Sequence, residues 1–215
     1  MPSSNRRKIV ESYLTARETV IKMGYTTELE WQNSRDLSAL SESAFLEEAA
    51  WVILSTGLRE IVVRRRFPKI SQAFMNWVSA ELIAQNRSSC EAMAIKVFNN
   101  SRKIPAIGSI CERVALMGLD TIREHICKDG FEFLQEFDFI GPVIRYHLAK
   151  NTGLDVVKPD CHLVRIANAA RCDSPIRLCQ VISDATGEKL SVVDLVLWRY
   201  ATIDPQYIDL FRMRD

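Results

Sequence analysis

The sequence has little glycine or proline. Eight glycines and seven prolines among 215 residues make about 7% of the chain, against roughly 12% in average proteins. Because tight turns draw on these two residue types, a fold rich in short strands and hairpins is disfavoured. Apolar residues recur at the helical period along almost the whole chain, and no strand-like alternation lasts longer than a few residues. Composition and pattern together predict an all-α protein.

Paired cysteines and a long apolar run are also absent. The six cysteines stand alone, without a Cys-x-x-Cys pair, at Cys90, Cys111, Cys127, Cys161, Cys172 and Cys179. This spacing argues against a disulfide framework and favours thiols that fill core positions in a reducing compartment. The apolar, uncharged run at residues 49–58 is far shorter than the roughly 20 residues that span a bilayer. The first residues contain no apolar signal-peptide core, so we expect a cytoplasmic protein and no membrane partner.

An excess of one charge sign is missing as well. Lys+Arg number 28 and Asp+Glu 27, a formal net charge of +1, which excludes a histone-like or polybasic protein. The balance conceals a local polarity: residues 27–48 carry six acidic side chains and one arginine, whereas residues 59–69 carry five basic ones and one glutamate. The neutral total therefore does not count against nucleic acid. The charge pattern predicts local binding through one face, with modest affinity when no flipped base is held.

Helical segments cover most of the chain. We expect helices over residues 5–23, 43–63, 70–85, 88–98, 102–117, 119–128, 130–137, 142–152, 160–170, 175–186 and 191–200. Asp160 stands directly before an apolar-periodic stretch, the usual place of an N-cap. Ser191, with Asp194 three residues on, resembles a capping box that begins the last of these helices.

Residues 130–152 have the pattern of a helix-hairpin-helix. The first helix ends at Phe137, a short Asp-Phe-Ile-Gly turn follows, and the second helix begins at Pro142, whose missing N–H is harmless at a first helical position. We expect the N–H groups of Gly141 and of the next helical turn to lack partners. Such groups favour an anion such as phosphate, so the motif can hold a nucleic-acid backbone without net positive charge.

The hairpin is followed by the segment VVKPDCHL at residues 156–163. Hairpin and segment together resemble the helix-hairpin-helix DNA glycosylases of base-excision repair, whose Gly/Pro-rich motif closes on an aspartate. Asp160 occupies the place of that aspartate, and the following helix matches the family at His162, Leu163, Arg165 and Ile166. The resemblance extends over residues 40–200, and its specific part is residues 130–167.

The resemblance implies a chemistry centred on Asp160. In this family a carboxylate stabilises the positive charge that develops on the sugar as the N-glycosidic bond breaks, and it orients or deprotonates the attacking water. Members that also cleave the strand carry a nucleophilic lysine, and the alignment puts Val143 at that position. We therefore expect a monofunctional glycosylase that uses water, with Lys158 as a phosphate contact or a solvated side chain.

No cofactor is expected. Many relatives hold a [4Fe–4S] cluster with four C-terminal cysteines, whereas this chain offers only Cys172 and Cys179 there, and such a cluster needs four thiolates. Zinc is equally unsupported, because His125, His147 and His162 have no paired cysteines around them. A monovalent cation at the hairpin is the one ion that the resemblance leaves open.

Some segments resemble the 3-methyladenine DNA glycosylase I group in particular. They are Gly57-Leu58 with the basic run that follows, residues 100–107 (NSRKIPAI), and the hairpin with Tyr146. Val52, however, falls where this group has its base-reading glutamate, and the zinc-binding Cys/His set of the group is missing. The damaged base therefore stays open, with an alkylated base as one option.

DNA contacts are expected on several segments. The backbone-binding candidates are the hairpin residues Phe139, Ile140, Gly141 and Val143, the run Arg64, Arg65 and Arg66, and Lys158. A flipped base needs stacking and hydrogen bonds to its edge. The candidates for this pocket, or for the wedge that replaces the base, are Trp51, Leu58, Tyr146 and His147. Arg102 and Lys103 form a further basic pair with a similar claim on phosphate.

The sequence thus predicts an all-α, two-lobed helical DNA glycosylase fold with a helix-hairpin-helix and an interlobe cleft. Residues 41–155 form one lobe, which ends in the hairpin at residues 130–152, and residues 1–40 with 156–215 form the other. The expected partner is double-stranded DNA with a damaged base, bound by a monomer that in a bacterium would associate with the nucleoid. The alternative is a non-catalytic helix-hairpin-helix DNA-binding protein in which Asp160 merely caps its helix.

Overall fold

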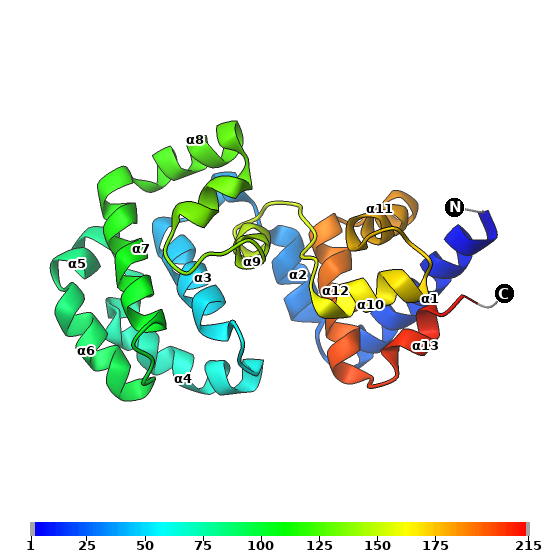
Figure 1. Cartoon of the computed structure of the whole chain (residues 1–215), viewed down its shortest axis with the longest axis horizontal. Helices are drawn as coiled ribbons and strands as arrows, with labels where there is room; N and C mark the ends of the chain where they lie inside the picture. The colour runs from blue at the N-terminus through cyan, green and yellow to red at the C-terminus, as the bar shows by residue number, and fades with distance from the viewer. Residues whose placement is uncertain (1–2, 214–215) are drawn as a thin grey trace. The chain divides into compact units, whose positions relative to one another are not determined.

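The computed structural model describes residues 3–213, and its secondary structure is helical. Helices account for 76% of the chain, and no strand occurs in the described part, which confirms the all-α class. The chain divides into two compact units (Figure 1): unit 2 is Asp36–Thr152, and unit 1 comprises the residues up to Arg35 and those from Gly153 onward. The lobe expected at 41–155 thus compares with a unit that begins and ends a few residues earlier. None of the described helices is long and apolar enough to cross a membrane.

Unit 2 is built around two apolar helices, α3 (Glu42–Ser55) and α7 (Lys103–Met117). Both contribute fully buried side chains to its core, among them Phe45, Ile53 and Ile104. The other elements of this unit are, in chain order, η1 (Leu37–Ala39), α4 (Glu60–Ala73), η2 (Met75–Trp77), α5 (Ala80–Gln85), α6 (Arg87–Val97), α8 (Leu119–Asp129), η3 (Phe131–Glu136) and α9 (Ile144–Asn151). α4, α5 and α9 contact α3, while α5, α6 and α8 contact α7.

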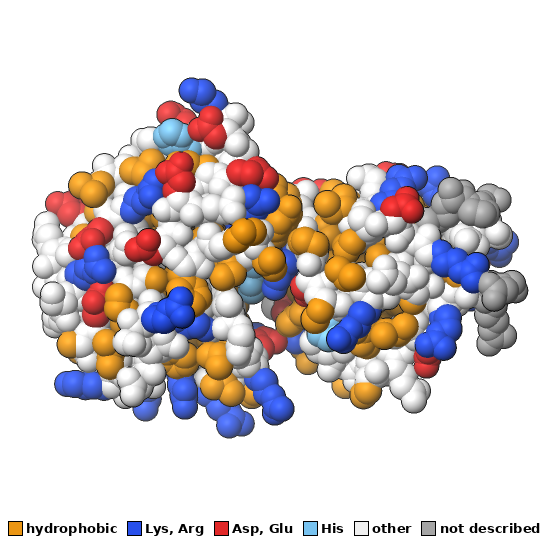
Figure 2. Space-filling view, viewed as in Figure 1, with side chains coloured by type: hydrophobic (Ala, Val, Ile, Leu, Met, Phe, Trp, Pro, Cys, Tyr) orange, Lys and Arg blue, Asp and Glu red, His pale blue; other side chains and the backbone are white. Residues whose placement is uncertain are grey.

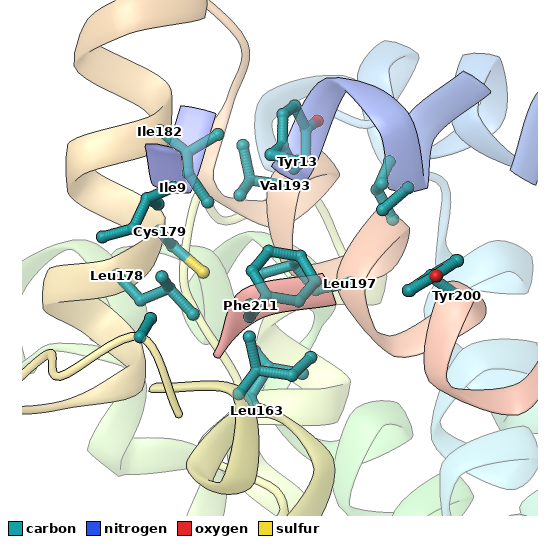
Figure 3. Close-up of a cluster of buried hydrophobic side chains, with 14 of the residues drawn as sticks. Ile9, Tyr13, Leu163, Leu178, Cys179, Ile182, Val193, Leu197, Tyr200 and Phe211 are labelled. Atoms are coloured by element: carbon teal, nitrogen blue, oxygen red, sulfur yellow. The ribbon is translucent and has the colours of Figure 1, made fainter. Parts of the chain in front are cut away.

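Unit 1 is assembled from both ends of the chain around α12 (Leu190–Ile203). The remaining helices of this unit are α1 (Ser3–Lys22), α2 (Thr26–Ser34), α10 (Cys161–Ala169), α11 (Pro175–Thr186) and α13 (Tyr207–Phe211), and each of them contacts α12. α12 is buried on almost all sides, as expected of a helix that is apolar all round. In its core, Tyr13 of α1, Cys179 of α11 and Leu197 of α12 gather with Phe211 (Figure 3).

The helix expected over residues 43–63 is in fact two helices. α3 ends at Ser55 and α4 begins at Glu60, with Gly57 between them at φ +70°. This backbone conformation strains residues that carry a Cβ, so the glycine ends the helix rather than continuing it. Thr56 Oγ1 donates to the Val52 carbonyl at 2.8 Å and satisfies part of the last turn of α3.

The hairpin also differs from its expected form. Its first arm, η3, is a 3₁₀-helix rather than an α-helix, and α9 begins at Ile144 rather than at Pro142. The expected open amide of Gly141 was a wrong prediction, since this N–H donates to the Phe139 carbonyl at 3.2 Å and closes the turn. Among the described residues, the amides of Val143 and Ile144 form no hydrogen bond. The open donors therefore lie just after Pro142, at the beginning of α9.

The two predicted caps have opposite outcomes. The Asp160 cap is confirmed, because its Oδ1 accepts from the amides of His162 and Leu163 at 2.9 and 3.0 Å. The Ser191–Asp194 capping box is wrong: α12 already begins at Leu190, and the Ser191 amide donates to Asp155 Oδ1 at 2.8 Å. The buried Asp194 instead accepts from the Lys158 amide at 2.6 Å. Asp155 and Asp194 therefore fasten the segment that leads to Asp160 onto α12.

Candidate functional site

Asp160 is a half-buried carboxylate at the first turn of α10. Its Oδ1 is held by two backbone N–H groups, whereas its Oδ2 forms no hydrogen bond among residues 3–213. Two donors on one oxygen fix the orientation of the carboxylate, and the helix N-terminus favours negative charge there. The second oxygen is left able to accept a proton or to stabilise a cation.

The residues after Asp160 brace the same turn. His162 Nδ1 lies 3.1 Å from the hydroxyl of Tyr207, and the two rings meet at 64° with their centroids 5.4 Å apart. Arg165 reaches the same hydroxyl at 3.5 Å from one turn further along α10. Because Tyr207 is buried in the core of unit 1, it connects the first turn of α10 to that core.

The hairpin residues divide into a buried anchor and an exposed edge. Ile140 is only 2% exposed, so its side chain holds the turn in the core of unit 2. Phe139 has φ +69°, a conformation that is costly for a bulky residue, and its ring lies 5.8 Å from Lys103 Nζ. Val143, which is 51% exposed, offers an apolar side chain and an open amide at the beginning of α9.

The first arm of the hairpin is fastened from α7. Arg113 donates to the Glu136 carbonyl at 2.7 Å and forms an ion pair with the carboxylate of the same residue. Its guanidinium also lies 5.2 Å from the ring centroid of Phe137, within the range of cation–π attraction. Arg113 therefore fixes the end of η3, which leads into the turn that carries the open amides.

The basic run lies on α4, and Lys and Arg side chains line the edge of unit 2 along which this helix extends (Figure 2). Arg64, Arg65 and Arg66 are all exposed. Arg64 forms an ion pair with Glu60 one turn earlier and lies 5.5 Å from the ring centroid of Trp51, while Arg66 lies 5.7 Å from that of Phe98. Arg64 and Arg66 thus face different neighbours, Trp51 of α3 and Phe98 after α6, so the three charges spread over more than one side of α4.

Arg66 also borders a groove in unit 2. The groove has a volume of about 580 Å³ and is lined by Thr56, Gly57, Leu58, Arg66, Lys96, Val97, Phe98, Asn99, Asn100 and Lys103. The wedge candidate Leu58 is 41% exposed at its wall. The α3–α4 joint, the end of α6 and the beginning of α7 thus meet at one hollow, which contains three cationic side chains.

The other base-pocket candidates lie in aromatic clusters of unit 2. Trp51 meets Phe67 edge-on at 5.2 Å between ring centroids, which joins α3 to α4. Tyr146 meets Phe131 in the same way at 4.9 Å, which joins α9 to η3. His147 is half-buried on α9 beside Tyr146. Lys158 is half-buried in unit 1, where its backbone amide is held by Asp194.

Sequence reasoning missed two polar residues of the groove, Lys96 and Asn99, and it placed Asn100 only in the segment 100–107 without a role in a groove. Asn100 had one usable signal, because it precedes an apolar-periodic helix, and its Oδ1 accepts from the amides of Arg102 and Lys103 at 3.1 and 2.9 Å. Lys96 and Asn99 had none, since a lone lysine or asparagine at a helix end is most often a solvated residue.

Within residues 3–213, no group of three or more His, Cys, Asp or Glu side chains is arranged to hold a metal ion. Comparison of the chain with family models, with curated proteins and with solved structures finds no match.

Proposed function

We propose that this chain is a monofunctional DNA glycosylase that extrudes a damaged base from double-stranded DNA and hydrolyses its N-glycosidic bond. The observation that carries the proposal is the Asp160 carboxylate, oriented by two backbone amides with its second oxygen open, directly after a hairpin with open amides. The proposal includes the helix-hairpin-helix glycosylase fold, with its cleft, that the sequence resembles.

Asp160 would act on the sugar. As the bond to the base breaks, positive charge develops on the sugar ring, and a fixed carboxylate stabilises it more in the transition state than in the substrate. The open Oδ2 would also orient a water molecule and accept its proton as the new C–O bond forms. The base leaves with the electron pair of the broken bond, and the product is an abasic site.

The hairpin and the α4 edge would hold the DNA strand. The amides of Val143 and Ile144 at the beginning of α9 can donate to phosphate oxygens, and the exposed arginines of α4 neutralise neighbouring phosphates. Val143 carries no amine, so this position cannot form a Schiff base with the sugar. The strand should therefore stay intact until alkali cleaves the abasic site.

Base release from duplexes with alkylated, deaminated and oxidised bases tests the proposal. Asp160→Asn should reduce base release from the preferred lesion by about 10²-fold or more, because the amide cannot act as a base or stabilise the cation equally well. Asparagine is as good an N-cap as aspartate, so folding and duplex binding should be unchanged. Asp173→Asn, the same chemical change at an exposed aspartate of unit 1, serves as the matched control.

The results also separate the second candidate, a non-catalytic DNA-binding protein. Its support is that both hydrogen bonds of Asp160 are those of an ordinary cap. Tight duplex binding with no base release from any lesion by the wild-type chain would favour that candidate and refute the enzyme. Release followed by strand cleavage without alkali would refute the monofunctional mechanism.

A further inference from the structure

Lys103 is a buried cation in unit 2 with no acidic partner among the described residues. Its residue is 6% exposed, and its Nζ donates to the carbonyls of Leu54 and Thr56 at 2.8 and 2.6 Å. These carbonyls end α3, so the ammonium lies at the negative end of that helix. An ammonium has three N–H donors, and these two hydrogen bonds leave one unused. Burial lowers the pKa of Lys103, which reflects the cost of a charge without a counter-ion.

The charged residues that line the groove beside Lys103 are all cationic. Arg66 and Lys96 line it from α4 and α6, and no aspartate or glutamate is among its lining residues. None of the three cations forms an ion pair with an acidic side chain of residues 3–213. Elsewhere in unit 2, by contrast, Arg87, Arg113 and Arg123 each pair with a carboxylate.

Other polar groups complete the lining. The Oδ1 of Asn100 is occupied by the amides that begin α7, which leaves its side-chain NH₂ as a donor. Asn99 is exposed at the rim. Amide donors beside unpaired cations suit a phosphate oxygen, because each new hydrogen bond is charge-assisted.

We propose that this groove binds a backbone phosphate of DNA, with Lys103 as its buried cation and Arg66 and Lys96 at its rim. The inference rests on the proposed function for the identity of the ligand, since a free phosphate offers the same chemistry. The groove adjoins the hairpin turn through the ring of Phe139, and Leu58 forms part of its wall. A phosphate held here would position the strand next to the wedge candidate.

Duplex binding as a function of salt concentration tests the site in the full chain. The double variant Arg66→Gln/Lys96→Gln removes two charges at the rim of the groove, so it should fold normally. The slope of log K against log salt should become shallower by about 0.9 for each phosphate that is no longer neutralised, and binding should weaken equally on undamaged and damaged duplexes. Lys22→Gln/Lys128→Gln removes two exposed charges that lie neither in the groove nor on α4 and should change the slope less.

Lys103→Gln tests the buried cation separately. Glutamine keeps N–H donors for the carbonyls that end α3 but removes the charge. If circular dichroism shows the native helix content, the slope should again be shallower by about 0.9. If this variant is unfolded, the double variant still decides the question.

Inorganic phosphate distinguishes the two sources of the ligand. Isothermal titration with phosphate alone should give far weaker binding than duplex does. Phosphate binding that the groove variants abolish, together with an unchanged duplex slope, would overturn the proposal in favour of a free-phosphate site. Equal slopes in the groove and control variants would also overturn it.

The proposed function is tested by base release, which is a different measurement from the salt slope. If the wild-type chain releases no base but the groove variants have the shallower slope, the groove site stands and the enzyme does not. If base release is observed but the groove variants leave the slope unchanged, the enzyme stands and the groove site does not.

Discussion

Burial raises the pKa values of single cysteine and tyrosine residues in the two cores. Burial raises the pKa of the Cys111 thiol to about 12, while an unfolded chain ionises its cysteines near pH 8.5. Above that pH the unfolded state has lost the proton that the folded state keeps. The folded state is therefore destabilised as pH rises from about 8.5 towards 12, by up to about 1.4 kcal/mol per pH unit for this one thiol.

Urea unfolding between pH 7.5 and 10.5 checks this prediction with Cys111→Ala. The wild-type chain should lose stability more steeply than the variant, because only the wild-type chain contains Cys111. Tyr13, Tyr200, Cys90 and Cys172 also have raised pKa values, but they are present in both chains and affect both curves. The missing sulfur shifts the variant curve down by a constant amount. Parallel curves for the two chains would contradict the pKa argument.

The sequence predicts a residue's role when the partner is local. The cap at Asp160 depends on amides two and three residues later, so a single aspartate before an apolar-periodic helix is enough to infer it. Asp194 accepts instead from an amide 36 residues away, and no spacing rule contains that hydrogen bond. The sequence identifies Lys103 only as a basic residue. Its burial cannot be predicted, because it depends on hydrogen bonds to the carbonyls at the end of α3, about 50 residues earlier in the chain.

At the scale of elements, the segment before α10 depends on α12. The Lys158 amide donates to Asp194 Oδ2 at 2.6 Å, and this aspartate is 1% exposed. Asp194→Ala should lower the free energy of unfolding by about 1–3 kcal/mol, because the half-buried Lys158 amide loses its acceptor. Hydrogen exchange at the Lys158 amide should accelerate. Asp184→Ala, at an exposed aspartate of α11, should change neither quantity. If the Lys158 amide is still protected from hydrogen exchange in Asp194→Ala, this hydrogen bond does not hold the segment.

Elements with clear end signals are predictable, and elements whose ends depend on tertiary structure are not. α11 spans Pro175–Thr186 as expected, since proline suits its beginning and Gly187 adopts the left-handed conformation after its end. Gly57 fits a helical pattern in the sequence, because such a pattern tolerates a glycine. The structure uses it for a joint instead, where Lys103 and Thr56 satisfy the last carbonyls of α3.

At the scale of the molecule, the acidic and basic segments of the sequence differ in how far the folded structure pairs their charges. Three acids of the segment 27–48 form ion pairs or hydrogen bonds within their own unit. Glu28 pairs with Arg199, Glu42 accepts from the Ala80 amide, and Glu48 accepts from Asn151. The basic run on α4 remains exposed. The neutral total thus arises partly from acids that support the fold, while much of the positive charge lies on the surface. Composition could not show this, because it does not tell which charges are paired.

Each unit has its own core, and the cysteines report on the two cores separately. Cys127 and Cys161 are exposed, while Cys90 and Cys111 are buried in unit 2 and Cys172 and Cys179 in unit 1. In native buffer, a thiol reagent should therefore modify two cysteines quickly and four slowly. Modification of a buried thiol requires its unit to open, so its rate measures the stability of that unit.

Tyr13→Phe makes the two cores distinguishable. The Tyr13 hydroxyl donates to Glu188 at 2.5 Å within unit 1, and its loss should cost about 1.5–3 kcal/mol, as for a hydrogen bond to a charged group. Cys172 and Cys179 should then react at least tenfold faster under mild urea, since about 1.4 kcal/mol corresponds to a factor of ten. Cys90 and Cys111 should react at the wild-type rate, as peptide mass spectrometry can measure. Equal acceleration at all four sites would mean that the two units unfold as one, because the substitution lies in unit 1 alone.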